Sequence, residues 1–285
     1  MKLLVTGATG LLGSEVLRAA TARGHDVTGA GSSDADVTDP VQVDALLDAC
    51  RPDLVVHCAA FSAVDASEED PRRAMAVNGD GARHVARAAT RVGGRCLYVS
   101  SDYVFDGELR RPYRPDDPTS PLSVYGRSKR AGEVATLDAG RAALVVRTSW
   151  LFGHARRTFV TAMIERAARG ETPTIVDDQI GGPSSARDVA AALLDLAEAD
   201  AEGVWHVANR GETSWAQLAR EAIRIRGIEA EIEGVSSATW NAPARRPLYS
   251  VLDVTATEER IGRPMPTWSD ALARFLAEPR ERVRA

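Results

Sequence analysis

The sequence predicts an α/β protein: a Rossmann-like, doubly wound parallel sheet followed by a smaller C-terminal substrate-binding lobe. Three observations predict this fold class. Short apolar runs alternate with helix-length segments through the first half of the chain. A glycine-rich turn follows the first apolar run, directly after Thr6. After about Phe152, prolines and glycines interrupt the pattern, which favours a second and less regular unit.

The alternation gives a series of strands joined by crossover helices. The apolar runs are short and continuous, as expected of parallel strands that helices cover on both faces. Their connections are too long for hairpins and suit βαβ units. Strands are expected at Lys2–Thr6, Asp26–Gly29, Leu54–His57, Arg95–Ser100 and Ala143–Arg147, and helices at Leu11–Arg23, Val41–Cys50, Asn78–Val92 and Ser123–Asp138.

The second half of the chain is expected to be mixed. It should contain segments that complete the sheet together with the smaller lobe. Thr213 or Ser214 suits the N-cap of one of its helices, because a hydroxyl there satisfies free backbone amides. Helices are expected at Phe159–Arg169, Ala186–Glu198, Ser214–Arg226 and Trp268–Ala277.

Composition and charge limit the kinds of partner that the protein can be expected to bind. The chain has 285 residues and a net charge of −5, so nothing across the sequence favours nucleic acid or an anionic membrane. Three cysteines without CxxC spacing indicate a reducing compartment rather than a disulfide framework or a zinc site. No targeting segment and no apolar run of about 20 residues is present. We therefore expect a cytoplasmic protein, either a monomer or a homodimer.

The glycine-rich turn predicts a dinucleotide site. Gly7, Gly10 and Gly13 are spaced three and three, which departs from the usual G-x-G-x-x-G pattern. The physical logic is the same: a tight turn, close approach of the backbone to a pyrophosphate, and close packing of helix on strand. The N-terminus of the following helix presents free amides to the phosphates. Residues 1–150 are therefore expected to form mainly an NAD(P)-binding Rossmann domain, and residues 151–285 the mixed remainder.

The end of the second strand bears on the choice of cofactor. NAD enzymes often place a carboxylate there for the ribose hydroxyls. This chain has Ala30-Gly31-Ser32-Ser33, with neither an acid nor an arginine before Asp34. We expect NADPH, with NADH possible. Asp36-Val37 is a candidate contact for the adenine, although Asp36 equally suits a turn.

A tyrosine and a lysine four residues apart suggest acid–base chemistry. Tyr125 and Lys129 fall on one face of a predicted helix, about one turn apart. A tyrosine has an ordinary pKa near 10, and a nearby ammonium is expected to lower it and make the phenol a competent general acid. Ser101 ends the fourth strand, at the edge where ligands of such sheets bind, and its hydroxyl suits a substrate carbonyl. We expect Ser101, Tyr125 and Lys129 to be the catalytic residues.

Motifs along nearly the whole chain carry a family resemblance. They include Gly7-Ala8-Thr9-Gly10-Leu11-Leu12-Gly13, Asp36-Val37-Thr38-Asp39-Pro40, Cys58-Ala59-Ala60-Phe61-Ser62-Ala63-Val64-Asp65, Ser101-Asp102-Tyr103-Val104-Phe105-Asp106-Gly107, Tyr125-Gly126-Arg127-Ser128-Lys129, Arg147-Thr148-Ser149-Trp150 and Arg246-Pro247-Leu248-Tyr249-Ser250. Within the extended short-chain dehydrogenases/reductases, the chain resembles the dTDP-4-dehydrorhamnose reductases. The segment from Asp102 to Gly107 is the most distinctive.

The resemblance implies reduction of the C4 ketone of a dTDP-4-keto-6-deoxyhexose by NAD(P)H. Tyr125 would donate the proton, and Lys129 would hold the nicotinamide ribose. The family pattern implies dinucleotide contacts from Gly7, Thr9, Gly10, Leu11, Leu12, Ser32, Asp36, Val37, Cys58, Ala59, Ala60, Tyr125 and Lys129. It implies substrate contacts from Ser101, Asp102, Tyr103, Trp150 and Arg246, with the arginine at the diphosphate.

Departures from the family leave details open. Thr158-Phe159 stands where relatives often have Asn-Phe, and Ser32 near where they carry arginine. Some members bridge subunits through a metal. Glu15 and Asp188 would match that site, but Arg187 stands where another acid is wanted, so we expect no metal.

Two further functions stay open at this point. One is a non-catalytic, dinucleotide-binding regulatory subunit, like the β subunit of methionine adenosyltransferase, which resembles the same reductases. The other is a nucleotide-sugar epimerase that keeps its nicotinamide bound between half-reactions. The intact set of Ser101, Tyr125 and Lys129 favours the reductase.

Overall fold

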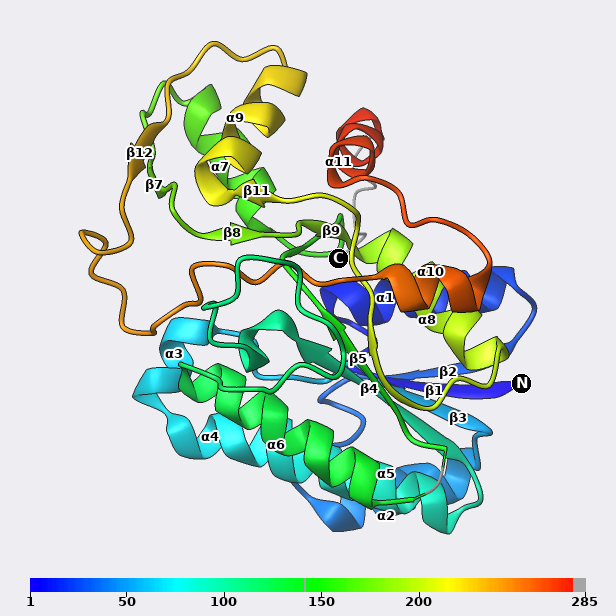
Figure 1. Ribbon diagram of the computed structural model, residues 1–285. Helices are drawn as coiled ribbons and strands as arrows, with labels where there is room; N and C mark the ends of the chain where they lie inside the picture. Colours follow the sequence, from blue (N-terminus) through cyan, green and yellow to red (C-terminus); the bar gives the residue numbers. More distant parts are fainter. Residues whose placement is uncertain (141, 279–285) are drawn as a thin grey trace.

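The central element is a sheet of six parallel strands (Figure 1). The computed structural model describes residues 1–140 and 142–278. The strand order is β10-β5-β4-β3-β1-β2, so the chain reverses direction across the sheet between β1 and β3, the place where such sheets bind ligands. The strands are β1 (Lys2–Thr6), β2 (Asp26–Ala30), β3 (Leu54–His57), β4 (Arg95–Ser101), β5 (Leu144–Thr148) and β10 (Gly203–His206).

Helices cover both faces of the sheet, because alternate residues of each strand point to opposite sides. Leu3 and Val5 of β1 pack in one apolar cluster with α1 and α8, while Leu4 packs in another with α2 and α5. The doubly wound α/β class is therefore confirmed. One layer holds α1 (Leu11–Ala22) and α8 (Ala186–Glu198), and the other holds α2 (Pro40–Cys50), α5 (Gly81–Arg91) and α6 (Val124–Asp138).

The expected helix Asn78–Val92 is wrong in its first part. The chain forms α3 (Val64–Glu69), α4 (Pro71–Met75) and a π-helical turn η1 (Ala76–Asp80) before α5 begins at Gly81. The turn buries Asn78, whose side chain accepts from the Phe61 amide (2.8 Å) and donates to the Phe61 carbonyl (3.0 Å) and Ser128 Oγ (2.9 Å). These bonds from the turn hold the loop after β3 against α6, a contact that helical periodicity does not predict.

A smaller group of elements from the second half stands above the sheet (Figure 1). In it α7 packs on α9, and three short two-stranded pairs, β12 with β7, β11 with β8, and β6 with β9, run beside them. Ser214 caps α9 by accepting from the Gln217 amide at 3.1 Å, as one of the two expected caps. The elements are β6 (Leu151–Phe152), α7 (Phe159–Ala168), β7 (Thr174–Val176), β8 (Ile180–Gly181), β9 (Ser184–Ser185), β11 (Thr213–Ser214), α9 (Trp215–Ile225), β12 (Glu233–Val235) and α11 (Trp268–Ala277). The helix α10 (Thr255–Ile261) packs instead on α8 and β10 of the main sheet.

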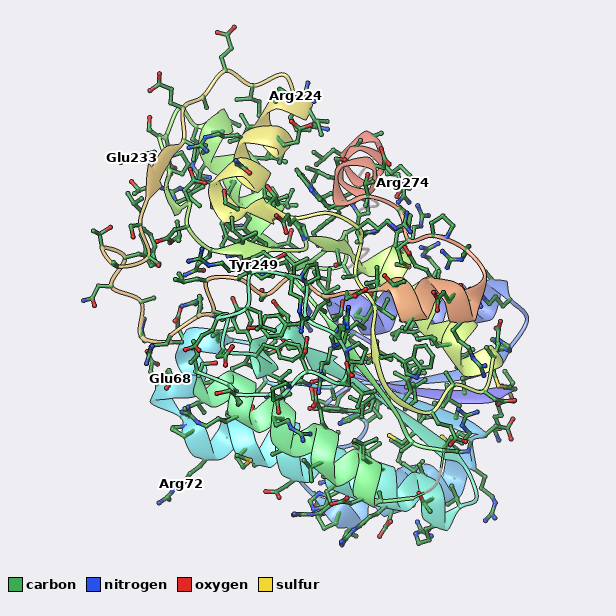
Figure 2. All side chains as sticks on the ribbon, in the orientation of Figure 1. Glu68, Arg72, Arg224, Glu233, Tyr249 and Arg274 are labelled. Atoms are coloured by element: carbon green, nitrogen blue, oxygen red, sulfur yellow. The ribbon has the colours of Figure 1, made fainter. Side chains whose placement is uncertain are left out.

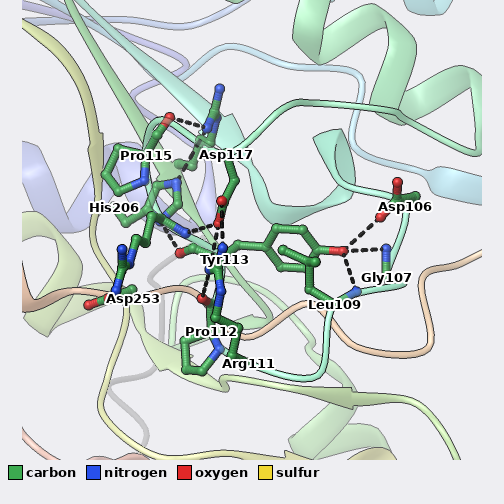
Figure 3. Close-up of polar contacts among 12 residues, drawn as sticks. Asp106, Gly107, Leu109, Arg111, Pro112, Tyr113, Pro115, Asp117, His206 and Asp253 are labelled. Carbon is green, nitrogen blue, oxygen red and sulfur yellow. Dashed lines mark hydrogen bonds and ion pairs between the residues drawn. The ribbon is translucent and has the colours of Figure 1, made fainter.

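A buried tyrosine fixes the loop that leaves β4 (Figure 3). The Tyr113 hydroxyl donates to Asp106 Oδ1 (2.7 Å) and accepts from the amides of Gly107 (2.9 Å) and Leu109 (3.3 Å). Its ring stacks on Phe105 with 4.1 Å between the centroids. The distinctive motif after Asp102 is therefore a folded loop whose shape depends on a tyrosine further along the chain.

Candidate active site

One cavity of about 860 Å³ opens along the carboxyl ends of β1, β3, β4 and β5. It brings together residues that the sequence assigned to cofactor and to substrate. Those on its walls are Gly7, Thr9, Gly10, Leu11, Leu12, Ser32, Asp36, Val37, Cys58, Ala59, Ala60, Ser101, Asp102, Tyr103, Tyr125, Lys129 and Trp150. Their individual roles stay predictions. Arg246 alone among the expected residues does not line this cavity.

The glycine-rich turn is shaped to hold an anion. Gly7 has a φ of +67°, and a side chain there would lie 2.6 Å from the Ala59 amide nitrogen. A side chain on Gly13 would lie 2.2 Å from the Gly7 carbonyl oxygen, so α1 packs directly on the turn. The N-cap of α1 is Gly10, which has no side-chain cap, and the first amides of the helix stay free for phosphate oxygens. This cradle fits a dinucleotide pyrophosphate.

The end of β2 offers no carboxylate to a ribose. Asp34, the nearest acid after the strand, accepts from the Gly31 amide at 2.7 Å and does not line the cavity. Ser32 does line it. Asp36 lines it too, but its Oδ1 accepts from both the amide (2.9 Å) and the hydroxyl (2.8 Å) of Thr38, so its carboxylate also closes a turn. The carboxylate of Asp34 would therefore not repel a phosphate group on the ribose.

The start of α6 is held firmly, and this places Tyr125. Ser123 caps the helix by accepting from the Gly126 amide at 3.1 Å. Glu68, at the end of α3, accepts from the Val124 amide at 2.7 Å, and Figure 2 shows it beside the start of α6. The Tyr125 ring meets Tyr103 edge-on, with 5.9 Å between the centroids. Tyr125 is therefore half-buried at the wall of the cavity, next to the end of β4.

Burial governs the proton affinities of this pair. It raises the pKa of Tyr125 to about 12, against a lowering by the hydrogen bond with Ser101, and the Asp102 charge raises it further. Burial lowers the pKa of Lys129 to about 7, which the Glu133 charge opposes. The expectation that the tyrosine pKa is lowered is therefore wrong for the chain by itself, because desolvation of the phenolate outweighs the lowering by the Ser101 hydrogen bond.

Lys129 is almost fully buried beneath the cavity. Its exposed fraction is 2%, and its Nζ lies 4.2 Å from the centre of the Tyr98 ring. Four residues further along α6, the buried Glu133 accepts from Ser100 Oγ (2.6 Å) and from Arg147 Nε (2.8 Å). The lysine thus sits between an aromatic face and a buried acid that is itself neutralised by an arginine.

Two tryptophans form one wall. Trp150 and Trp215 stack with 3.6 Å between ring centroids and 8° between planes, and both line the cavity. Trp150 has a φ of +44°, a strained conformation of the kind that concentrates at functional sites. Its buried indole N–H has no hydrogen-bond partner within residues 1–140 and 142–278. The aromatic pair suits the face of a sugar or a base.

Sequence reasoning missed several residues on the cavity wall, among them Trp215, Arg156 and Arg73. Trp215 stacks on Trp150, which was expected at the site. Arg156 donates from Nε to the Thr9 carbonyl at 3.4 Å, and the guanidinium of Arg73 lies 4.9 Å from the centre of the Phe61 ring. No spacing in the sequence pointed to either arginine. Arg246 instead donates to Asp65 Oδ2 at 2.8 Å, so its expected contact with a diphosphate stays a prediction.

Other site classes find little support in the described part of the chain. Residues 1–140 and 142–278 hold no group of three or more His, Cys, Asp or Glu side chains placed to bind a metal. Glu15 pairs with Arg18, and Asp188 pairs with Arg274. Over the same residues, every helix is too short or too polar to cross a bilayer.

Comparison with known proteins decides the family. The family described as "RmlD substrate binding domain" matches residues 1–281. The chain belongs to this family. A dTDP-4-dehydrorhamnose reductase of Streptomyces griseus is 42% identical over 94% of this chain and 91% of its own length. A dTDP-4-dehydrorhamnose reductase of Mycobacterium tuberculosis is 41% identical over 98% of this chain and 93% of its own length. The resemblance seen in the motifs is confirmed.

A solved structure supports the same relationship. The dTDP-4-dehydrorhamnose reductase of Bacillus anthracis, solved in complex with NADP, superimposes with a TM-score of 0.94 at 33% identity. The match covers 98% of this chain and the whole of that one. The RmlD-family fold therefore extends over both the parallel sheet and the elements above it.

Proposed function

We propose that this protein reduces the C4 ketone of a dTDP-4-keto-6-deoxyhexose, such as dTDP-4-dehydrorhamnose, with NADPH, and with NADH as a possible second cofactor. The single observation that carries the proposal is the meeting of Ser101, Tyr125 and Lys129 on the wall of the cavity that contains the glycine cradle. The relatives named as dTDP-4-dehydrorhamnose reductases supply the substrate class.

When bound, the dihydronicotinamide supplies a hydride to the ketone carbon. Tyr125, whose pKa is about 12, holds its proton at neutral pH and gives it to the ketone oxygen, which becomes a hydroxyl. The Ser101 hydroxyl stands beside Tyr125 to orient that oxygen. Lys129 is expected to hold the ribose of the dinucleotide, and the cradle at Gly7 and Gly10 its phosphates.

The remaining assignments are part of the same proposal. Residues 1–150 would bind mainly the dinucleotide, and residues 151–285 would add the sheet-completing segments and the lobe over the sugar; residues 279–285 lie outside the described part. Three free cysteines support a reducing compartment, for which we propose the cytoplasm. Monomer and homodimer both fit.

The test is turnover with a defined sugar nucleotide. Purified protein is mixed with NADPH and dTDP-4-keto-6-deoxyhexoses, and cofactor oxidation is followed beside product analysis by NMR. Stoichiometric oxidation supports the reductase. Binding without turnover would instead support a regulatory subunit, and conversion of the sugar without cofactor consumption would support an epimerase.

Tyr125→Phe separates the chemistry from binding. The variant keeps the ring and its edge-on contact with Tyr103 but has no proton to give. Turnover should fall about 10²-fold or more, the scale for losing a general acid, while NADPH binding stays near that of the wild type. Activity like that of the wild type would remove Tyr125 from the mechanism.

A further inference from the structure

A buried carboxylate lies directly behind the serine of the active site. Asp102 is 2% exposed and holds two hydroxyls: Ser101 Oγ donates to its Oδ1 at 2.9 Å, and Ser250 Oγ donates to its Oδ2 at 2.7 Å. Among the ion pairs of residues 1–140 and 142–278, none involves Asp102. Two neutral hydroxyls are weak compensation for a buried negative charge.

Ser250 reaches this acid from a distant part of the chain. Its amide donates to the Ile180 carbonyl of β8 at 2.8 Å, while its hydroxyl bonds the carboxylate at the end of β4. Figure 2 shows the neighbouring Tyr249 on the segment that runs between the upper elements and the sheet. Ser250 is 1% exposed, so its hydrogen bond with Asp102 is shielded from bulk water. Asp102 is therefore held by Ser101 at the end of β4 and by Ser250 of the segment that contacts β8.

The hydrogen bonds that Ser101 already makes determine whether its hydroxyl can also donate to a substrate. A serine hydroxyl has one proton and two lone pairs. The Tyr103 amide donates to Ser101 Oγ at 3.2 Å, which occupies one lone pair, and the proton goes to Asp102. The neighbouring Tyr125 oxygen can take the serine proton only when Asp102 releases it. With an ionised Asp102, Ser101 thus has no proton for a ketone oxygen. With a protonated Asp102, the acid donates to the second lone pair and the serine proton is free to turn toward the cavity.

We propose that Asp102 is a positioning residue that sets the direction of the Ser101 hydroxyl: protonated, it turns the serine proton toward the substrate carbonyl, and ionised, it withdraws that proton. Reduction is then fastest when Asp102 is protonated. This inference rests on the proposed function, because it concerns the oxygen that Tyr125 protonates.

The surroundings of Asp102 make both forms accessible near neutral pH. Burial raises the pKa of Asp102 to about 7, and the hydrogen bonds from Ser250 and Ser101 oppose that rise. The titratable groups that face it are Tyr103 of η2 (Asp102–Val104) and Tyr125 of α6, both neutral at this pH because burial raises their pKa. Arg246 interacts with Tyr103 and Asp65. Within residues 1–140 and 142–278, no cation forms an ion pair with Asp102.

The first test is the pH dependence of the reduction step in single turnovers. The wild-type rate should fall as pH rises from 6 to 9, toward a floor about 10²-fold lower, the scale of losing one donor at a developing oxyanion. Asp102→Asn keeps the shape, since its amide donates to Ser101 and its oxygen accepts from Ser250. Its rate should lose the part of the decline that Asp102 causes and keep only the part that titration of Lys129 causes, with little change in KM. Asp106→Asn, the same change four residues on, should keep the wild-type decline.

A second pair of variants tests the direction of the hydrogen bonds. Ser250→Ala removes a donor to the carboxylate, so the pKa of Asp102 rises and the decline moves to higher pH. Ser101→Ala lowers the rate and removes the part of the decline that Asp102 causes, because no hydroxyl is left to redirect. A wild-type decline in Asp102→Asn, or an unmoved midpoint in Ser250→Ala, would overturn the proposal.

Infrared spectroscopy separates this proposal from the proposed function. A protonated carboxyl band should titrate near pH 7 in the wild type, be absent in Asp102→Asn and titrate at higher pH in Ser250→Ala, without any substrate. If that band titrates as described but no dTDP-4-keto sugar is reduced, the proposed function fails and the titration of Asp102 stands. If sugars are reduced and no such band exists, the role of Asp102 is refuted. Should Asp102→Asn not fold, the Ser250→Ala shift decides.

Discussion

Replacing Glu133 by glutamine should destabilise the whole protein, because the buried acid neutralises a buried arginine. Glu133 is fully buried and Arg147 is 3% exposed. Arg147 donates to both carboxylate oxygens, from Nε at 2.8 Å and from Nη2 at 2.9 Å, and Ser100 Oγ adds a third bond at 2.6 Å. The neutral variant leaves the guanidinium without a counter-charge in a place that water does not reach.

The size of the effect follows from this geometry. Removing one partner of a buried pair costs about 3 to 5 kcal/mol. Glutamine keeps the volume and an acceptor oxygen, so the loss should lie near 3 kcal/mol. For a chain of this size each kcal/mol lowers Tm by roughly 2 to 4 °C, which gives a fall of roughly 6 to 12 °C. Calorimetry or urea unfolding at pH 7 measures it.

Two controls isolate the buried pair. Asp48→Asn breaks an exposed bond to Arg91 (2.7 Å), which water screens, so its Tm should stay close to that of the wild type. Adding Arg147→Met to Glu133→Gln removes the stranded charge and should recover part of the loss, so the two changes are not additive. A Tm for Glu133→Gln within about a degree of the wild type would refute the reasoning.

Two further predictions concern the cradle and the acid limit of stability. In Gly13→Ala the added carbon would lie 2.2 Å from the Gly7 carbonyl oxygen, so the turn must shift and the Kd for NADPH should rise roughly tenfold or more. A fluorescence titration measures this Kd, with Gly182→Ala as the control, because the carbon added there makes only ordinary van der Waals contacts. Equal affinities of the two variants would contradict the prediction. Arg111, hydrogen-bonded to Asp117, lowers the pKa of that acid from 3.8 to about 2, so its stabilisation is present above pH 4 and is lost as pH falls toward 2. Asp117→Asn should therefore lower the urea midpoint at pH 7 and progressively less below pH 4, and a difference from wild type that is constant with pH would refute the assignment.

Most of the main sheet was predictable because its strands are short apolar runs. β1 and β3 have the expected bounds, β2 and β4 end one residue later, and β5 begins and ends one residue later, whereas β10 was not among the expected strands. β8 and β11 are only two residues long and leave no period for a sequence to show. They form because the chain above the sheet brings distant segments together, which is tertiary information.

The site was predictable to the extent that it lies at strand ends. Ser101 and the residues after β1 and β3 share one cavity because parallel strands end at one edge. Asn78 and Ser250 were not predicted as part of the site, since their importance lies in contacts with Ser128 and Asp102, 50 and 148 residues away. The sequence does not show which distant residues the hydroxyl of a serine or the side-chain amide of an asparagine will contact.

The wrong expectation about Tyr125 shows where local sequence reasoning ends. Spacing along a helix gives the neighbour of an ionisable group but not the amount of protein around it, and burial decides the sign of the shift here. The outcome still suits a reductase, because a reduction needs a phenol that carries its proton rather than a phenolate. A pKa of about 12 keeps that proton in place across the neutral range. Since Tyr125 stays protonated there, a decline of the reduction step above pH 7 has to come from another group. Burial brings the pKa of both Lys129 and Asp102, the acid in contact with Ser101, to about 7, and the comparison with Asp102→Asn separates the two.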